Sequence, residues 1–242
     1  MKTFKTHVNE ELTFEFHDEL NSKFWKNEEM IDKIRKQLLL IADKWSKFAD
    51  IPKSAIKDVV LVGGNANFNY TKFSDLDVHL LVDYSKVVEC EEDFVAEYLR
   101  DKKSIWEFTH DITVFGVPVE VFAEPLGRPM KKSQGVFSLI QNKWLQKPKK
   151  EKIDLKNDDF VRSKVDHDIH MINYALKHHA DDEGTIKKLK KRLQVERGVG
   201  IRRAGEYSVE NLVFKELRNR GYIDKMKTFI AKIQDRNLSM EK

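Results

Sequence analysis

Two aspartates separated by one residue, Asp75 and Asp77, are the best candidates for chemistry in this chain of 242 residues. The residues around them alternate between apolar and polar, as expected for a strand with one buried face. On such a strand both carboxylates project from the other face, about 7 Å apart along the chain. Mg²⁺ prefers oxygen ligands and shares them with substrate phosphates, so this pair suits one or two hard cations. The buried positions are Leu76, Val78, Leu80 and Val82.

A double glycine, Gly63-Gly64, precedes the aspartates and supplies a second component of a site. The apolar run 59–62 predicts a buried strand, and the glycines allow the backbone to turn sharply and approach a ligand closely. Asn65 suits the cap of a short helix, whose free N–H groups would face an anion. The segment therefore predicts a phosphate-binding turn beside a cation-binding pair.

This order of residues resembles the signature of the DNA polymerase β-like nucleotidyltransferase superfamily. The signature is a hydrophobic residue, Gly-Gly, a spacer and then Asp-hydrophobic-Asp-hydrophobic, here Ser74-Asp75-Leu76-Asp77-Val78. The resemblance implies a third acid on a later strand. In the segment 112–122 we favour Glu120, which two valines flank, although many members have Asp at this position. Asp111, at the start of the preceding strand, is the competing choice.

The resemblance also implies a reaction. Asp75 and Asp77 would hold the metal that carries the triphosphate of an NTP, with ATP expected, and all three acids would hold a second Mg²⁺ or Mn²⁺. The second metal lowers the pKa of an acceptor hydroxyl, which attacks the α-phosphorus while pyrophosphate leaves. Ser74 either positions the turn or serves only as a capping or packing hydroxyl. The expected nucleotide-binding residues are Gly63, Gly64, Asn65 and Ser74.

The sequence leaves the acceptor open: the 3′ end of a tRNA or other RNA, a protein hydroxyl, a small molecule such as an aminoglycoside, or a second nucleotide that gives an oligonucleotide signal. A catalytically silent nucleotide-binding or nucleic-acid-binding protein is the alternative class, and the presence of all three acids argues against it. A kinase is disfavoured because Walker-type and kinase catalytic-loop motifs are absent from the sequence. The last third, from GEYSVENLVFKELRNRGYI onward, is similar to tails of phage-encoded nucleotidyltransferases.

The fold that the resemblance implies is an α/β core of the α+β type, with helices on one face of a small mixed sheet. Hydrophobic periodicity predicts a helix over 31–48 and a connecting helix over 86–100. Gly116 and Pro118 suggest a hairpin turn within 112–122. The segment 135–145 predicts two short strands about a Gln-Asn turn.

A polar, proline-marked connector follows near Lys147, so the predicted domains are a core at 1–147 and a helical region at 148–242. Helices are expected over 158–179, from the segment 182–185 onward, from Ser208 to a stop at Gly221, and over 223–233. The group Asp166 to His170 is interpreted as a polar helix face. His79 shares the strand face of the aspartates and is expected to border the site.

Basic residues crowd one part of the helical region against a single acid, Glu196. They form either a surface for nucleoside triphosphate or nucleic acid, or a solvated helix face. Gly198 and Gly200 predict a loop, which would present the arginines to a ligand. The residues are Lys187, Lys188, Lys190, Lys191, Arg192, Arg197, Arg202 and Arg203.

The composition fits an enzyme of a reducing compartment. Charged residues make up 35% of the chain, and the net charge is +4. Cys90 is the lone cysteine and can form no internal disulfide. The N-terminal residues lack an apolar signal core, and no apolar run has the length of a membrane span. We therefore expect a cytoplasmic protein, in the host cytoplasm if it is phage-encoded, with no membrane partner.

Overall fold

The structure is a computed structural model that describes residues 11–127, 134–150, 158–179 and 181–239. It divides the chain into two compact units. The sheet unit comprises Glu15–Lys152, and the helical unit comprises Met1–Phe14 with Ile153–Lys242. The sequence-based division places residues 11–14 with the core, whereas Leu12 and Phe14 are buried in the hydrophobic core of the helical unit.

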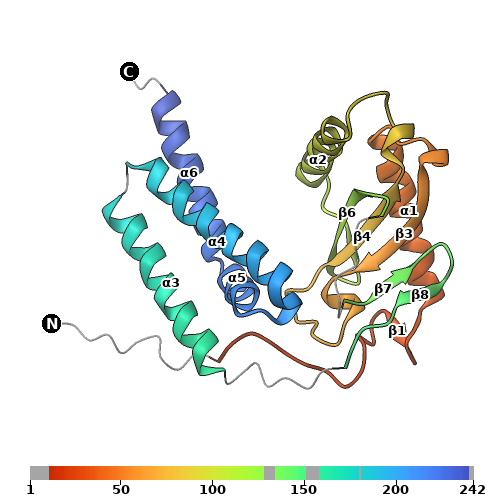
Figure 1. The fold of residues 1–242 in the computed structure, drawn as a ribbon, viewed down its shortest axis with the longest axis horizontal. Helices are drawn as coiled ribbons and strands as arrows, with labels where there is room; N and C mark the ends of the chain where they lie inside the picture. Colours follow the sequence, from red (N-terminus) through yellow and green to blue (C-terminus); the bar gives the residue numbers. More distant parts are fainter. Residues whose placement is uncertain (1–10, 128–133, 151–157, 180, 240–242) are drawn as a thin grey trace. The chain divides into compact units, whose positions relative to one another are not determined.

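A six-stranded mixed sheet forms the centre of the sheet unit (Figure 1), with the strand order β5-β6-β4-β3-β7-β8. The parallel pair is β4 with β6, and the other neighbours are antiparallel. This architecture confirms the mixed α/β class. The strands are β3 (Ile56–Val62), β4 (Leu76–Val82), β5 (Thr113–Val114), β6 (Val117–Pro125), β7 (Val136–Ser138) and β8 (Lys143–Gln146), with a separate small sheet of β1 (Trp25–Lys26) and β2 (Glu29–Met30).

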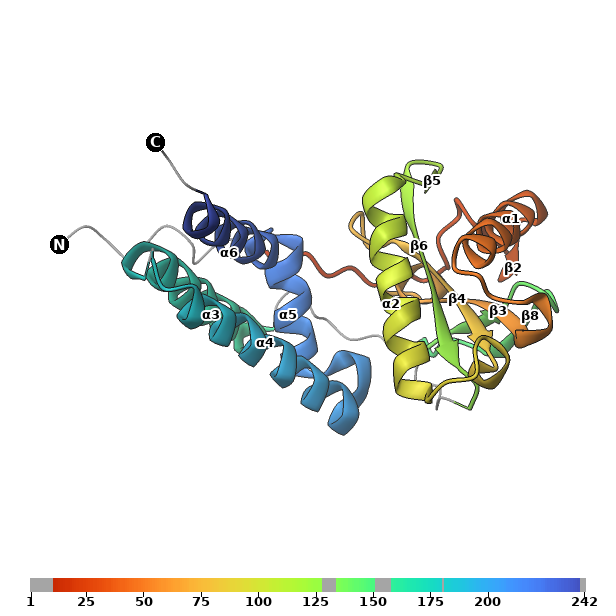
Figure 2. The ribbon, with the colours of Figure 1, turned by 90° about the horizontal axis from the view of Figure 1, so that it is seen from above.

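Two helices, α1 (Asp32–Phe48) and α2 (Glu92–Thr109), bury the apolar face of the sheet. The alternating residues of β4 are fully buried there, as the sequence predicts, together with Val119 and Val121 of β6. Figure 2 shows α2 lying along β6. Since successive side chains alternate across a strand, the opposite face of β4 and β6 carries the polar residues. Short 3₁₀ turns are η1 (Lys53–Ala55), η2 (Gly64–Ala66), η3 (Tyr84–Lys86) and η4 (Gly205–Tyr207).

The predicted elements of the sheet unit are confirmed, with two shifts in position. The connecting helix expected over 86–100 begins later, at Glu92, where two acidic residues favour the helix N-terminus, and its buried stripe continues to Trp106. The hairpin before β6 turns at Phe115 and Gly116, which both have positive φ, whereas Pro118 lies within β6 opposite Thr113.

The helical unit consists of α3 (Asp159–His178), α4 (Glu183–Ala204), α5 (Val209–Asn219) and α6 (Tyr222–Leu238). The side chain of Asp158 caps α3, and that of Asp182 caps α4. Gly221 adopts the left-handed conformation between α5 and α6, as expected for a helix stop. No helix in the described part of the chain is both long and apolar enough to span a membrane.

The loop predicted at Gly198 and Gly200 is wrong, because α4 continues through both residues to Ala204. Gly200 is buried where α4 meets the start of α5. A Cβ atom on Gly200 would lie 2.6 Å from Glu210 Oε2 and 2.8 Å from Ser208 Oγ. The glycine therefore permits close packing of two helices, which is a tertiary requirement that resembles a loop signal in the sequence.

Asp168 of α3 forms an ion pair with Arg192 of α4. Asp168 is 1% exposed, and its Oδ1 accepts a hydrogen bond from Arg192 at 3.1 Å. Burial raises the pKa of this carboxyl group, and the positive charges of Lys164 and Arg192 offset the effect only in part. The interpretation of 166–170 as a polar helix face agrees with these contacts, which pair Asp168 with basic side chains.

A raised pKa in the folded state predicts how stability depends on pH. The unfolded carboxyl group titrates near pH 3.9, so Asp168 contributes stability below that pH and loses it as pH rises through the raised folded value. We expect the Asp168→Asn variant to gain stability relative to the wild type as pH rises from 4 to 7. Thermal unfolding followed by circular dichroism at 222 nm measures this difference. Asp166→Asn, two residues away, is the matched control, and an equal trend in both variants would contradict the assignment.

Candidate active site

Three carboxylates meet on the polar face of the sheet. Asp75 directly precedes β4, Asp77 lies on β4, and Glu120 lies opposite Asp77 on the parallel strand β6. Each offers an oxygen atom, and the three oxygens lie within 4.8 Å of one another. All three residues are half-buried. Among the described residues, these three acids form the group of His, Cys, Asp or Glu side chains that could hold a metal ion. Asp111 is exposed and lies outside this group.

The glycine turn lies directly beside these acids. Gly63 has φ 77° and ψ −164°, a backbone conformation that is essentially restricted to glycine. A Cβ atom on Gly63 would lie 1.7 Å from Asp77 Oδ2, so no side chain fits there. Gly64 is similarly close to Ser74, because a Cβ atom added to Gly64 would lie 2.6 Å from Ser74 Oγ. The two glycines therefore bring the main chain against the acid cluster.

Asn65 has a different role from the expected helix cap. Gly63 is the N-cap of η2, and the Asn65 side chain is buried, with 1% exposure. Its amide nitrogen donates to the carbonyl of Asp75 at 2.8 Å and to that of Ser74 at 3.2 Å. Its amide oxygen accepts from Asn21 at 2.8 Å. Asn65 thus fixes the main chain that carries the first aspartate, while its backbone N–H stays in the first turn of η2, where helix N–H groups have no intrahelical partner.

Ser74 and Asn67 shape the same turn. The hydroxyl of Ser74 accepts a hydrogen bond from the N–H of Thr71 at 2.9 Å, which agrees with the turn-positioning alternative. The buried side chain of Asn67 donates to the carbonyl of Gly63 at 2.5 Å and accepts from the N–H of Gly135 at 2.8 Å. Asn67 was missed by the sequence analysis, because its partners lie 4 and 68 residues away in the chain.

A lysine of α2, Lys103, reaches the acid cluster. Its ammonium lies 3.0 Å from Glu120 Oε2 and 3.0 Å from Glu107 Oε1. Burial lowers the pKa of Lys103, but the charge of Glu120 and the hydrogen bonds that the ammonium donates to both carboxylates outweigh it, so the pKa is raised overall. Lys103 therefore stays charged. The sequence signal that could have found it is the spacing of four residues between Lys103 and Glu107 on a predicted helix.

His79 lies on the acid face of β4, two residues beyond Asp77, as predicted. Its Nδ1 lies 3.4 Å from Glu124 Oε2, and its ring packs on that of Phe122 with 3.9 Å between centroids. The imidazole is thus held by neighbours of its own on β6. It borders the acid cluster and is outside the group of candidate ligands.

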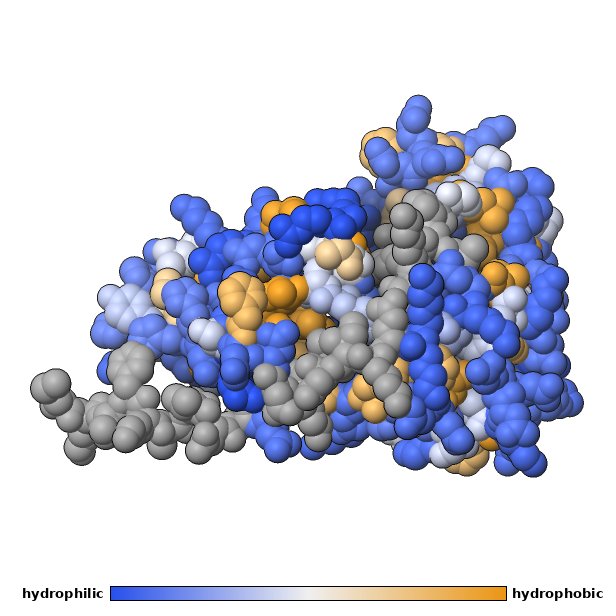
Figure 3. Space-filling model, turned by 60° about the horizontal axis from the view of Figure 1, so that its bottom comes forward, coloured by the Kyte–Doolittle hydropathy of each residue, from blue (hydrophilic) through white to orange (hydrophobic). Residues whose placement is uncertain are grey.

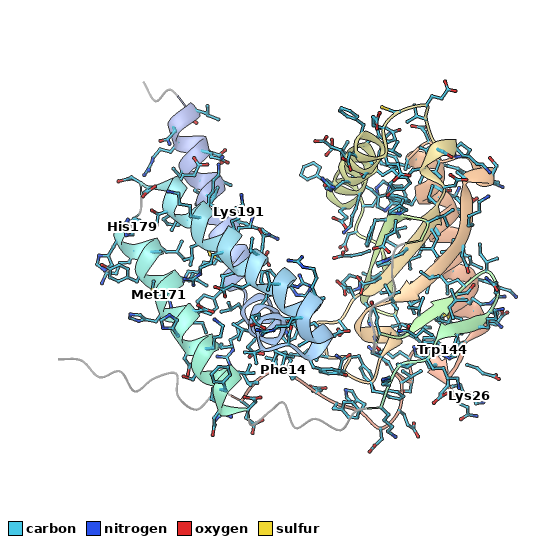
Figure 4. All side chains as sticks on the ribbon, in the orientation of Figure 1. Phe14, Lys26, Trp144, Met171, His179 and Lys191 are labelled. Carbon is cyan, nitrogen blue, oxygen red and sulfur yellow. The ribbon has the colours of Figure 1, made fainter. Side chains whose placement is uncertain are left out.

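The basic residues of α4 divide into two sets. Lys187, Arg192 and Arg203 have acidic partners within the helical unit. Arg197 donates to Asn211 at 3.0 Å. The second set has no acidic partner in the described part of the chain and consists of Lys188, Lys190, Lys191 and Arg202. Figure 4 shows Lys191 on α4. Figure 3 gives the hydropathy of one face of the protein, most of which is hydrophilic.

Comparisons with known proteins leave the family open. No protein-family model and no curated protein matches the chain. Among solved structures, a STING-associated CdnE c-di-GMP synthase from Capnocytophaga granulosa aligns with 10% sequence identity and a TM-score of 0.20, over 86% of this chain and 83% of that one. At this TM-score the likeness shows neither a shared fold nor a shared function.

Proposed function

We propose that this protein is a metal-dependent nucleotidyltransferase, which transfers a nucleoside monophosphate from an NTP to an acceptor hydroxyl and releases pyrophosphate. The observation that carries the proposal is the meeting of three acids, Asp75, Asp77 and Glu120, beside a glycine turn with no room for a side chain. Carboxylate oxygens bind hard cations, and a bare glycine backbone can approach phosphates closely. Each feature alone is common, and their direct contact at Gly63 supports a single site.

The donor set fits Mg²⁺ or Mn²⁺. Both ions prefer oxygen ligands and retain positions for water and phosphate, and the three acids are open enough to leave such positions. When bound, the ions would neutralise charge on the triphosphate and lower the pKa of the acceptor hydroxyl.

The protein's own groups would then bind and orient the reactants. Asp75 and Asp77 face the triphosphate, and Glu120 completes the side where the acceptor binds. The backbone N–H groups of the turn at 63–65 donate to phosphate oxygens. The acceptor hydroxyl gives its proton to water and its oxygen forms a bond to the α-phosphorus. The bond from that phosphorus to the bridging oxygen breaks, and pyrophosphate leaves with the electron pair. Positioning of this kind supplies much of the rate in phosphoryl transfer.

RNA is the acceptor that we propose first. Its support is the basic surface of α4, where Lys188, Lys191 and Arg202 are exposed and have no acidic partner in the described residues. Lysine and arginine side chains of this kind contact nucleic-acid phosphates and make binding depend on salt. An oligonucleotide signal made from two nucleotides is the second candidate, because the acid cluster would serve either acceptor equally.

The experiment is transfer of label from each α-³²P NTP in Mg²⁺ or Mn²⁺, with total RNA and protein present. We expect the wild type to label RNA, with ATP as the preferred donor, and Asp75→Ala/Asp77→Ala to label nothing. Gels locate label on RNA or protein, and thin-layer chromatography detects a labelled oligonucleotide. Because each phosphate contact releases counter-ions, Lys188→Ala/Lys191→Ala should label RNA less than the wild type at low salt and should lose that labelling less steeply as salt rises.

The outcomes separate the parts of the proposal. Label on a small nucleotide product, with none on RNA, would reject the RNA acceptor and retain nucleotidyl transfer. Equal labelling by the wild type and the double aspartate variant would place the reaction outside the acid cluster. If the wild type transfers no label and binds no NTP, the enzyme proposal is wrong.

A further inference from the structure

Lys103 is held by three groups at the edge of the acid cluster. Its ammonium lies 3.0 Å from carboxylate oxygens of Glu120 and Glu107, and 5.1 Å from the centroid of the Phe122 ring. The side chain is 23% exposed, so water shields these interactions only in part. Two carboxylates and an aromatic face give the ammonium a fixed position.

This position gives Lys103 two opposing effects on the cluster. Carboxylates whose oxygens lie within 4.8 Å repel one another, and a nearby positive charge relieves that repulsion. The same charge opposes the entry of a divalent cation and occupies one of the two carboxylate oxygens of Glu120. The ammonium therefore orders the third acid and weakens the attraction of the cluster for metal.

We propose that Lys103 is a built-in counter-ion of the acid cluster, which positions Glu120 and sets the affinity of the site for divalent cations. The inference rests on the proposed function, because it takes Asp75, Asp77 and Glu120 as the cation ligands. Glu107 takes part in the same arrangement. It also pairs with the ammonium of Lys103, and this weakens the interaction of Lys103 with Glu120. Lys103 acts through Glu120 and is a positioning residue.

The test is titration of the full-length protein with Mn²⁺, with free Mn²⁺ measured by electron paramagnetic resonance at low ionic strength. Lys103→Met should bind Mn²⁺ about fivefold more tightly, because a positive charge several ångströms from the ion is removed. Lys103→Arg, which keeps the charge, should bind as the wild type does. Glu107→Gln should bind several-fold more weakly, since it removes a negative charge and leaves the ammonium to Glu120.

Lys102→Met is the matched control. Lys102 precedes Lys103 on α2 and has similar exposure, 24%, but its ammonium pairs with Asp50 at 3.0 Å. If the ion pair of Lys103 is only structural, Lys103→Met would behave like Lys102→Met: the free energy of unfolding would change, and the Mn²⁺ affinity would stay at the wild-type value. If Lys103→Met fails to fold, Glu107→Gln decides, and unchanged or tighter binding by it overturns the inference.

The inference and the proposed function fail in different ways. Unchanged or weaker Mn²⁺ binding by Lys103→Met, with binding lost in Asp75→Ala/Asp77→Ala, would overturn the counter-ion role and leave the cation site intact. Equal Mn²⁺ binding by the wild type and the double aspartate variant would reject the cation site, and the role of Lys103 with it.

Discussion

Replacement of Asp77 by alanine is expected to lower nucleotidyl transfer by about a thousandfold and to leave the protein folded. Asp77 is half-buried on the polar face of β4, and its neighbours Asp75 and Glu120 carry the same charge. Removal of one of three adjacent carboxylates relieves repulsion, so the free energy of unfolding should be unchanged or slightly higher. The initial rate of label transfer measures the first effect, and urea unfolding followed by tryptophan fluorescence measures the second.

Tryptophan fluorescence suits this experiment because all four tryptophans, Trp25, Trp45, Trp106 and Trp144, belong to the sheet unit. They therefore report the unit that contains the mutation.

The matched variants for this prediction are Glu120→Ala and Asp111→Ala. Glu120 lies within the acid cluster, and Asp111 is the exposed alternative outside it. Glu120→Ala should lose transfer as Asp77→Ala does, whereas Asp111→Ala should keep the wild-type rate. An Asp77→Ala protein that unfolds would show a structural role for this aspartate, and one that keeps its activity would remove the proposed site.

The sequence was most informative where function and local periodicity coincide. Alternation along β4 placed both aspartates on one face, and the valines beside Glu120 placed that acid on a strand. The parallel pairing of β4 with β6, which sets Asp77 opposite Glu120, is a long-range contact that periodicity cannot supply. The choice of Glu120 over Asp111 agrees with this geometry, and its catalytic role stays a prediction.

The residues whose roles could not be predicted from the sequence have partners far away in the chain. Asn67 joins the glycine turn to Gly135, and Lys103 reaches a carboxylate on a strand 17 residues later. Gly200 was misinterpreted because a glycine required by helix packing has the same sequence signal as a glycine required by a loop. Sequence patterns indicate that a position requires glycine. Whether a loop or a helix contact requires it depends on the tertiary structure.

Replacement of Gly63 by alanine is the second large effect that we expect. The backbone conformation at Gly63 strains any other residue by about 1–3 kcal/mol, which should appear as a lower free energy of unfolding. The new Cβ atom would also occupy the place of Asp77 Oδ2, so the carboxylate must move. A displacement of about 1 Å can reduce a rate about a hundredfold, and transfer should fall by at least that factor.

Gly116→Ala separates strain from displacement of the acid. Gly116 has φ 76°, nearly the value of Gly63, but it lies in the β5–β6 hairpin and a Cβ atom there would meet nothing within 4 Å. We expect a loss of stability of about 1–2 kcal/mol in urea unfolding and an unchanged rate of label transfer. If both variants lose stability alike and both retain activity, the position of the Asp77 carboxylate has no bearing on the reaction. Loss of activity in Gly63→Ala alone would instead show that the reaction requires the main chain and the carboxylate in direct contact, as the proposed site demands.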